Sequence, residues 1–440
     1  MNGQPGSPDP RGAGLAAAVR RRWRDFTELA PAQRLTTIVL GLMVVSGVAL
    51  RIWNLGALPR LAFDEHHFVP AARAYLVGGV DENDHPPLGK LFIAVGMLLF
   101  GDNAIGWRAA SLILGLQTLV VAAALARQLF ADRRAAWFAA AFFAGDGFFI
   151  SYSRTALLDG GLTCLVLWTM LAAVTARSWR GVLATAIGVG LAASVKWSGG
   201  FVIVPAALAV LMLARAPRWT LSLFAVAPLV HVGLWIAGLA ICGRPPNLLA
   251  TLALMKGLVE HHIAVGKVPN GLASPWYSWL TLYHPIVIKL SGHGARIRYS
   301  TSAGNPLLYL STTLAILWAF GTGVSAAART GVRDWWLRVR SQPEVRAVAL
   351  LTAGWLALLA PWMFGRSVGT YIYHYLPSYG FALTLVAGLG ARLERRWPRL
   401  TAGYVLAAFA LVLFFAPVWA ELPIPESVAN RRLLFPLWRP

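Results

Sequence analysis

Long apolar runs, separated by short polar connectors, make up most of the chain. A helix that crosses the hydrocarbon core of a membrane needs about 20 apolar residues, or fewer when flanking Arg or Trp side chains reach the interface. By this criterion we expect eleven membrane-spanning helices and an all-α, polytopic membrane fold. Their approximate ranges are 35–54, 107–126, 135–152, 158–176, 181–196, 198–214, 219–242, 304–326, 347–365, 376–391 and 400–418.

The apolar run at 91–101 is too short to cross. At about 1.5 Å per residue it reaches roughly half way through a bilayer core. If it does not cross, the short Arg-rich connectors all fall on one side, which the positive-inside rule identifies as the cytoplasm. We therefore expect 91–101 to be an interfacial or re-entrant helix. The connectors concerned contain residues 20–24, 127–134, 177–180, 215–218, 329–340 and 392–399.

This arrangement divides the chain into a membrane domain, 31–420, and two tails. The Gly- and Pro-rich residues 1–30 are expected to be a disordered cytoplasmic tail without a cleavable signal peptide, and 421–440 an outer tail. A first outer loop, 55–106, and a long outer loop, 243–303, belong to the domain. The long loop is too short for a typical extra folded domain, so we expect it to form part of a pocket wall.

Residues 63–90 form the most acidic segment. Five of the eighteen carboxylates lie here: Asp64, Glu65, Asp81, Glu82 and Asp84. Acids between hydrophobic helices cost desolvation free energy unless they are hydrated, paired or used in function. Apolar residues at spacings of three and four over 68–76 predict a helix on the membrane surface, with Asp64 and Glu65 in its first turn. The alternative is that these two acids only cap this helix.

Composition excludes a soluble globular protein, because 57% of residues are hydrophobic and only 13% are charged. The net charge of +21 would suit a nucleic-acid partner, but the Arg residues stand between apolar runs, so we expect the lipid bilayer and no nucleic acid. The two cysteines, Cys164 and Cys242, lie within or at the end of apolar runs. They indicate neither a disulfide framework nor a thiolate metal site.

Four polar groups are expected to meet at the outer membrane face. They are Asp64 and Glu65 with His85; Asp146, Arg154 and Asp159; Lys196; and Tyr373, His374 and Tyr375. A carboxylate base beside fixed cations is the arrangement that group transfer from a lipid-linked phosphate donor needs. Arg154 is the preferred phosphate ligand because its forked donors match phosphate oxygens, with Lys196 and His374 in support.

Each of these cations also has a structural explanation. Arg154 could pair with Asp146 or Asp159 inside the bundle, since buried charges are usually paired. Lys196 could extend its ammonium group to the interface, and His374 between two tyrosines could be an interfacial anchor.

The long outer loop adds aromatic and histidine side chains. Trp276 and Trp279 fit either a membrane-interface belt or a contact with an acceptor. His261 and His262 could bind a metal with an acid from another loop, but adjacent side chains diverge and two residues do not make a site. A divalent metal is therefore possible but not indicated.

Six motifs occur in order between about 60 and 380, and together they are specific. They are FDEHHF followed by HPPLGK, DG…SR…LLD (146–159), SVKWSG (194–199), SPWYSW (274–279), GNP (304–306) and YHYLP (373–377). In these residues the chain resembles the protein O-mannosyltransferase family, membrane glycosyltransferases with the GT-C fold (GT39 type). The resemblance implies eleven spans and a large first outer loop, in agreement with the charge distribution.

The resemblance also implies a polyprenyl-phosphate-mannose donor, Ser or Thr acceptors on exported proteins, and inversion at the sugar carbon. It places the catalytic base at Asp64, with Glu65 beside it, and Arg154 and His374 near the donor phosphate. We expect Lys196 and Tyr375 to support the phosphate. The expected pocket residues are His85, Asp159, His262, Trp276 and Trp279, and no cofactor is expected.

Eukaryotic relatives carry a MIR domain in the long outer loop, for which 243–303 leaves no room. This departure points to a bacterial-type enzyme of the plasma membrane with its site on the outer face, and it leaves the acceptor open. One alternative is a transferase that acts on a lipid or glycan, as in aminoarabinose transfer. Another is a transporter or flippase, which would typically show inverted repeats that this sequence lacks.

Overall fold

The computed structural model describes residues 17, 24, 26–79, 81, 85–215, 217–265, 271–293, 296–364 and 369–434. Most of the expected N-terminal tail, with its arginines at 20–22, lies outside these residues. So do Glu82, Asp84 and the last six residues of the chain.

Within the described residues, seven helices are long and apolar enough to cross a membrane. They are α2 (Pro31–Ile52), α5 (Ala104–Phe130), α8 (Leu158–Thr175), α11 (Leu221–Ile241), α13 (Pro306–Thr330), α15 (Pro343–Met363) and α17 (Pro398–Trp419). An eighth span is broken, because α6 (Arg133–Ala144) and α7 (Gly147–Ser153) meet at a bend of 64°. The chain is therefore a multi-pass membrane protein, as the apolar runs predict.

The three other predicted spans are helical, but they do not meet this criterion, so the count of eleven is not confirmed. They are α9 (Trp179–Val195), the 3-10 turn η1 (Trp197–Val202) with α10 (Ile203–Leu213), and α16 (Leu376–Arg396). Every residue of α16 from Leu376 to Gly388 is buried. Because α16 packs on α6, α13 and α15, it forms the centre of the bundle.

Close backbone contact joins α2 to α6. A Cβ atom on Gly47 would come within 2.1 Å of the carbonyl oxygen of Ala144. One turn later Arg51, fully buried, donates to the carbonyl oxygens of Ala144 at 2.8 Å and Phe143 at 2.7 Å. Gly47 allows the two helix backbones to approach closely. The guanidinium of Arg51 provides hydrogen bonds for the carbonyl groups at the end of α6.

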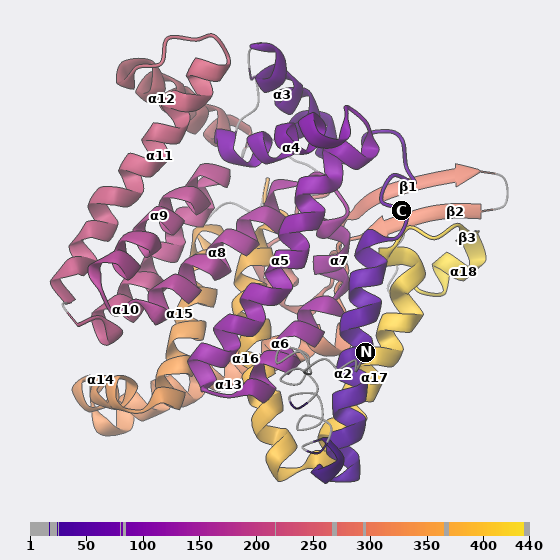
Figure 1. The fold of residues 1–440 in the computed structure, drawn as a ribbon, viewed down its shortest axis with the longest axis vertical. Helices are drawn as coiled ribbons and strands as arrows, with labels where there is room; N and C mark the ends of the chain where they lie inside the picture. The colour runs from indigo at the N-terminus through magenta and orange to yellow at the C-terminus, as the bar shows by residue number, and fades with distance from the viewer. Residues whose placement is uncertain are drawn as a thin grey trace, which may run out of the picture.

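Arg-rich connectors meet at one end of the bundle. Arg134 and Glu394 form an ion pair, Arg392 pairs with Glu344, and Arg395 lies 2.5 Å from Asp132. Figure 1 shows this lower end, where α16 turns into α17 and where the short helix α14 (Val332–Ser341) lies. The contacts agree with the prediction that these connectors share one side.

The opposite end carries α3 (Glu65–Val77), α4 (Pro87–Phe100) and α12 (Leu248–Val265), above the spans in Figure 1. With 14 residues, α4 is the short non-spanning helix predicted at 91–101. The remaining short elements are η2 (Pro217–Thr220), η3 (Trp276–Thr281), η4 (Ile372–Tyr375) and α18 (Glu426–Asn430).

The fold is mostly helical, as predicted, and a small antiparallel sheet lies at this end. Its order is β1 (Val287–His293), β2 (Arg296–Thr301) and β3 (Ile424–Pro425). In the register, Leu290 faces Tyr299 and Ile297 faces Ile424. The third strand comes from the C-terminal tail, so residues far apart in sequence form this sheet.

Candidate functional site

Asp64 stands at the start of α3, in the segment that follows α2. Phe63 before it has a φ of +50°, a left-handed turn, and Asp64 itself is half-buried. Its backbone carbonyl accepts the N–H of Phe68 at 3.1 Å, but its carboxylate makes no capping hydrogen bond. Asp64 is therefore the N-cap residue by position, but its side chain does not satisfy the free N–H groups at the start of α3.

Lys196 lies in the gap between α9 and η1, paired with Asp159 of α8. The ammonium nitrogen is 2.9 and 2.8 Å from the two carboxylate oxygens of Asp159 and 4.8 Å from the ring centroid of Tyr373. The Lys196 residue is only 5% exposed, so its ammonium group does not extend to the interface. It is a buried cation held between an acid and an aromatic face.

The charges of both members of this pair act on Asp64. Burial raises the pKa of Asp64, the positive charge of Lys196 opposes the rise, and the negative charge of Asp159 adds to it. A carboxyl group with a raised pKa that also feels the charge of a buried cation has a perturbed ionisation of the kind found at functional sites.

Tyr373 and His374 bring η4 against the Asp64 loop. The ring of Tyr373 lies 6.0 Å from Phe63 and 4.5 Å from His374. His374 stacks on Trp362, with centroids 3.8 Å apart and planes 11° apart. His374 is therefore packed within a group of side chains and is not an interfacial anchor. This group, called the Asp64 cluster, consists of Asp64, Asp159, Lys196, Tyr373 and His374.

His374 is expected to be a neutral donor and not a cation. Burial and the positive charge of Lys196 lower its pKa well below the ordinary value. Its Nδ1 accepts the backbone N–H of Tyr371 at 3.2 Å, so the single proton of the neutral ring belongs on Nε2. A neutral imidazole of this kind can donate one hydrogen bond to an anion.

His85 and His262 extend the cluster toward α12, with ring centroids 5.7 Å apart. His262 also lies 5.8 Å from Trp197, while His85 packs against Phe68 at 5.7 Å. Burial, followed by the charges of Lys196 and His262, lowers the pKa of His85 well below its ordinary value. In the described part of the chain, no three or more His, Cys, Asp or Glu side chains group as metal ligands would.

Glu65, next to Asp64, has the opposite environment. It is fully buried and pairs with Arg108, whose Nε and Nη2 each lie 2.8 Å from a carboxylate oxygen. The backbone N–H groups of Ala62 at 3.0 Å and Ala156 at 2.9 Å donate to the same carboxylate. With both oxygens engaged, Glu65 does not act beside Asp64 as predicted but holds the loop that carries it.

Arg108 completes this anchor from α5. Its guanidinium also donates to the carbonyl oxygens of Leu55 at 3.2 Å, Leu58 at 2.9 Å and Arg60 at 3.2 Å. Although burial opposes ionisation of Glu65, hydrogen bonds from Arg108 and the charges of Lys289 and Arg108 lower its pKa overall. The first outer loop is thus fixed around one buried ion pair.

Arg154 has a different role from the predicted phosphate contact. The side chain is fully buried and donates to the carbonyl oxygens of Leu50 and Trp53, each at 2.7 Å. Its Nε lies 3.4 Å from a carboxylate oxygen of Glu421, which Lys289 also contacts at 2.8 Å. Arg154 therefore pairs with neither Asp146 nor Asp159, and it holds the end of α2.

Tyr375 also differs from its prediction. Its hydroxyl accepts a hydrogen bond from Trp355 Nε1 at 3.0 Å, and its ring lies 5.9 Å from Tyr379 in the core. Tyr379 in turn donates to Asp146 at 2.9 Å. Asp146 accepts from the N–H groups of Phe148 and Asn305, so it caps α7 at the helix break.

Of the two tryptophans predicted to line the pocket, Trp279 is fully buried. Its indole N–H donates to the hydroxyl of Ser274 at 2.9 Å, and its ring lies 6.3 Å from His374. Trp276 is half-buried and packs against Tyr277 at 6.0 Å. Trp279 thus packs near His374 in the protein interior and does not form an interface belt.

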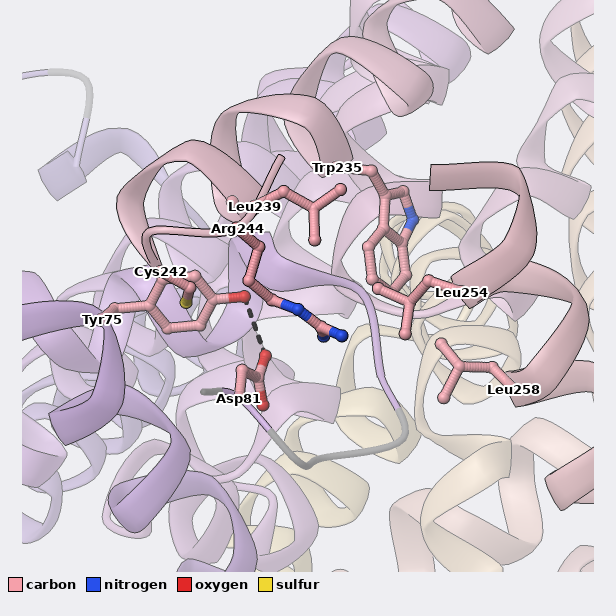
Figure 2. A pocket seen from close by; sticks show the side chains of 9 residues that line it. Tyr75, Asp81, Trp235, Leu239, Cys242, Arg244, Leu254 and Leu258 are labelled. Atoms are coloured by element: carbon pink, nitrogen blue, oxygen red, sulfur yellow. Dashed lines mark hydrogen bonds between the residues drawn. The ribbon is translucent and has the colours of Figure 1, made fainter. Parts of the chain in front are cut away.

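A small pocket beside the cluster lies between α3, α11 and α12 (Figure 2). Tyr75 donates to Asp81 at 2.8 Å, and Asp81 also pairs with Lys90 of α4. Lys90 then donates to the carbonyl oxygen of His85 at 2.7 Å. This chain of contacts fixes the backbone on which His85 stands. Cys242 borders the pocket and, like Cys164, is a buried free thiol.

Sequence reasoning missed several residues of this site. Arg108 could have been found, because a charge near the start of an apolar run is itself a signal of function or pairing. Lys90 ends the HPPLGK motif and its partners Asp81 and His85 are local, but no role was assigned to it. Lys289 and Glu421 give no local pattern, since they are 132 residues apart.

Family comparisons agree with the motifs. Residues 41–105 and 84–242 match two families described as dolichyl-phosphate-mannose-protein mannosyltransferase. Residues 250–438 match the C-terminal four-helix membrane region of protein O-mannosyltransferase. Together the three matches cover residues 41–242 and 250–438, and all three families are described as protein mannosyltransferases. The chain belongs to the protein O-mannosyltransferase family.

Bacterial members of this family are among its relatives. A polyprenol-phosphate-mannose–protein mannosyltransferase of Corynebacterium glutamicum is 24% identical over 92% of this chain and 94% of its own length. The enzyme of the same name from Mycobacterium tuberculosis is 31% identical over 37% of this chain, and that match spans 38% of the relative's length.

Solved structures share the fold. The protein O-mannosyltransferase Pmt1-Pmt2 complex of S. cerevisiae, bound to the sugar donor, aligns over 91% of this chain and 92% of the matched chain, with a TM-score of 0.75 and 12% identity. ArnT from Cupriavidus metallidurans aligns over 86% of this chain and 76% of its own, with a TM-score of 0.54 and 14% identity. Because the identities are low, these matches establish the GT-C fold and nothing further.

Proposed function

We propose that this protein is an inverting mannosyltransferase. It would move mannose from a polyprenyl-phosphate-mannose donor to Ser or Thr hydroxyls of exported proteins. The family, the name of the relative from Corynebacterium glutamicum and the geometry around Asp64 support this proposal.

The observation that carries it is that Tyr373 contacts both Phe63, next to the half-buried Asp64, and Lys196 of the buried pair with Asp159. The charges of that pair act on Asp64. In the proposed reaction Asp64 takes the proton of the acceptor hydroxyl. At the same time the oxygen of that acceptor hydroxyl forms a bond to the sugar carbon. The bond from that carbon to the phosphate oxygen breaks on the opposite face, and the polyprenyl phosphate leaves with the electron pair. A β-linked donor would then give an α-linked product.

Positive charge and one neutral donor favour departure of the phosphate. Lys196 is oriented by Asp159, and Nε2 of His374 carries a proton, so both can contact a phosphate oxygen within the cluster. With Asp159 and Tyr373 holding it, Lys196 loses little entropy on binding. We propose that the reaction requires no cofactor.

The outer face of the bacterial plasma membrane is the proposed location. The Arg-rich connectors meet at the end opposite to Asp64, and connectors of this kind remain in the cytoplasm. The site would then open to the side on which exported proteins emerge.

A lipid or glycan acceptor is the second candidate, because ArnT shares the fold. The relative from Corynebacterium glutamicum, which aligns over nearly all of this chain, favours a protein acceptor. An assay that offers radiolabelled donor to both a Ser/Thr peptide and a lipid decides between them.

The decisive experiment compares Asp64→Asn with the matched control Asp102→Asn, an exposed acid that pairs with Arg73 at the same end of the bundle. We expect Asp64→Asn to lose transfer by a factor of at least about 100, because a general base contributes roughly that much, while Asp102→Asn retains it. Both proteins should keep their thermal unfolding midpoint in detergent. Full activity of Asp64→Asn would remove the proposed base, and absence of sugar transfer by the unmodified protein would favour a transporter.

A further inference from the structure

A groove of about 570 Å³ lies between α13, α14 and α15, at the Arg-rich end and away from the Asp64 cluster. Its walls are mainly apolar, with Phe320 and Val324 from α13 and Val348 and Leu356 from α15. Phe320 and Val324 are 51% and 53% exposed, so the protein itself leaves this surface uncovered.

Polar groups of the groove gather at its rim. Arg338 and Gln342 come from α14 and its C-terminal cap, while Glu344 and Arg392 pair with each other. Arg338 is exposed, and its guanidinium makes no ion pair within the described residues. The rim therefore presents a cation above an apolar cavity.

The helix α14 has the pattern of one that lies in a membrane interface. Trp335, Trp336 and Val339 share its inner face, with Val339 fully buried, while three arginines at 333, 338 and 340 lie among the exposed positions. In Figure 1 this helix lies at the lower end of α13 and α15. An amphipathic helix with aromatic and basic residues lies at the level of lipid headgroups.

One residue of the groove wall has a buried polar atom. The hydroxyl of Thr352, on the wall formed by α15, has no hydrogen-bond partner among the described residues. A buried hydroxyl without a partner is costly, and an occupant with an acceptor oxygen below its charged head would satisfy it.

We propose that the groove binds an anionic glycerophospholipid from the leaflet at this end. Its acyl chains would lie between α13 and α15, its phosphate would contact Arg338, and an ester oxygen would approach Thr352. Charge complementarity favours this occupant, because basic segments at a membrane surface attract anionic lipids. The site is independent of the proposed mannosyl transfer.

The test uses delipidated full-length protein with added dioleoyl phosphatidylglycerol or dioleoyl phosphatidylcholine, and native mass spectrometry counts the retained lipid. The unmodified protein should retain phosphatidylglycerol preferentially. Arg338→Gln should lower its apparent affinity roughly fivefold, as expected for one arginine at a membrane surface. The matched control Arg333→Gln, on the same helix but not in the groove, should change it little.

A second variant keeps the charge and fills the cavity. Ala353 lines the groove and is half-buried, so Ala353→Trp should exclude the acyl chains and abolish retention of phosphatidylglycerol. Equal retention of the two lipids, or equal losses in Arg333→Gln and Arg338→Gln, would overturn the proposal. A dimer in light scattering that Ala353→Trp converts to monomer would show instead that a second copy occupies the groove.

Discussion

Two neighbouring carboxylates at the start of α3 have opposite electrostatic environments. Burial and the charge of Asp159 raise the pKa of Asp64, whereas Arg108 and Lys289 lower that of Glu65 against the effect of its burial. The separation of pKa values divides the pair into a candidate base and an anchor. From the sequence we expect both acids at the catalytic centre, with Asp64 as the base by family resemblance, because nothing local distinguishes two adjacent carboxylates.

The pH dependence of transfer should report the pKa of Asp64. A base must be ionised, so activity should fall as the pH drops through this raised pKa. Lys196→Met removes the charge that opposes the rise, and the acid limb should therefore move to higher pH. A pH profile of kcat/KM measures this shift, and an acid limb that stays in place would show that Lys196 does not act on Asp64.

Glu65→Gln should destabilise the protein, since it leaves Arg108 buried without its anionic partner. Removing one member of a buried ion pair typically costs about 3–5 kcal/mol. Thermal unfolding in detergent measures the loss, and Asp102→Asn is the exposed control. If Glu65 only anchors the loop, the remaining activity should keep the pH profile of the unmodified protein.

Arg154 shows why residue types do not define a site without coordinates. An arginine at the outer end of a helix suits a phosphate ligand, but its five donors can equally satisfy the carbonyl groups at the end of α2. The deciding partners, Leu50 and Glu421, lie far away in the sequence. Lys196 and His374 both contact Tyr373, so the structure brings these two predicted residues together, while their role stays a prediction.

At the scale of elements, hydrophobic pattern predicts helices well and misses their interruptions. The expected span 135–152 is broken at Gly145 and Asp146, because Asp146 caps a new helix and also binds Asn305 and Tyr379. The strands β1 and β2 were not predicted, although Ile297 and Tyr299 alternate with polar neighbours, because both runs are short and the third strand comes from the distant C-terminal tail.

The packing of α2 on α6 predicts a position-specific effect of glycine replacement. Gly47→Val should lower stability by about 1–3 kcal/mol, since its side chain would meet the carbonyl group of Ala144. Gly41→Val on the same helix has no atom within 4 Å of its Cβ and should change stability little. Chemical denaturation of the two variants in the same detergent makes the comparison, and equal losses would contradict this packing.

At the scale of the molecule, charge separates the bundle into two ends. Ion pairs join the Arg-rich connectors at one end, while the Asp64 cluster and the sheet lie at the other. The sequence predicts this separation of charge, because the positive-inside rule depends only on the composition of the connectors. The sequence does not predict which acid faces which base at one end, because that depends on tertiary contacts.

Single cysteines test the proposed orientation. After replacement of the two native cysteines by serine, Tyr277→Cys near the Asp64 cluster should react with an impermeant maleimide added to intact cells. Val332→Cys on α14 should react only after the membrane is opened, since both native side chains are exposed but at opposite ends. The reverse labelling pattern would place the site in the cytoplasm.

The ion cluster of Arg154, Lys289 and Glu421 unites three distant parts of the polypeptide. During synthesis the ribosome adds Glu421 after nearly every membrane segment has already been inserted. The end of α2, which Arg154 holds, therefore gains this ionic partner only when the end of the chain arrives. Nascent chains that stop before α17 should insert yet transfer no sugar, and supplying 398–440 as a separate fragment should restore transfer if this ion cluster must hold the end of α2.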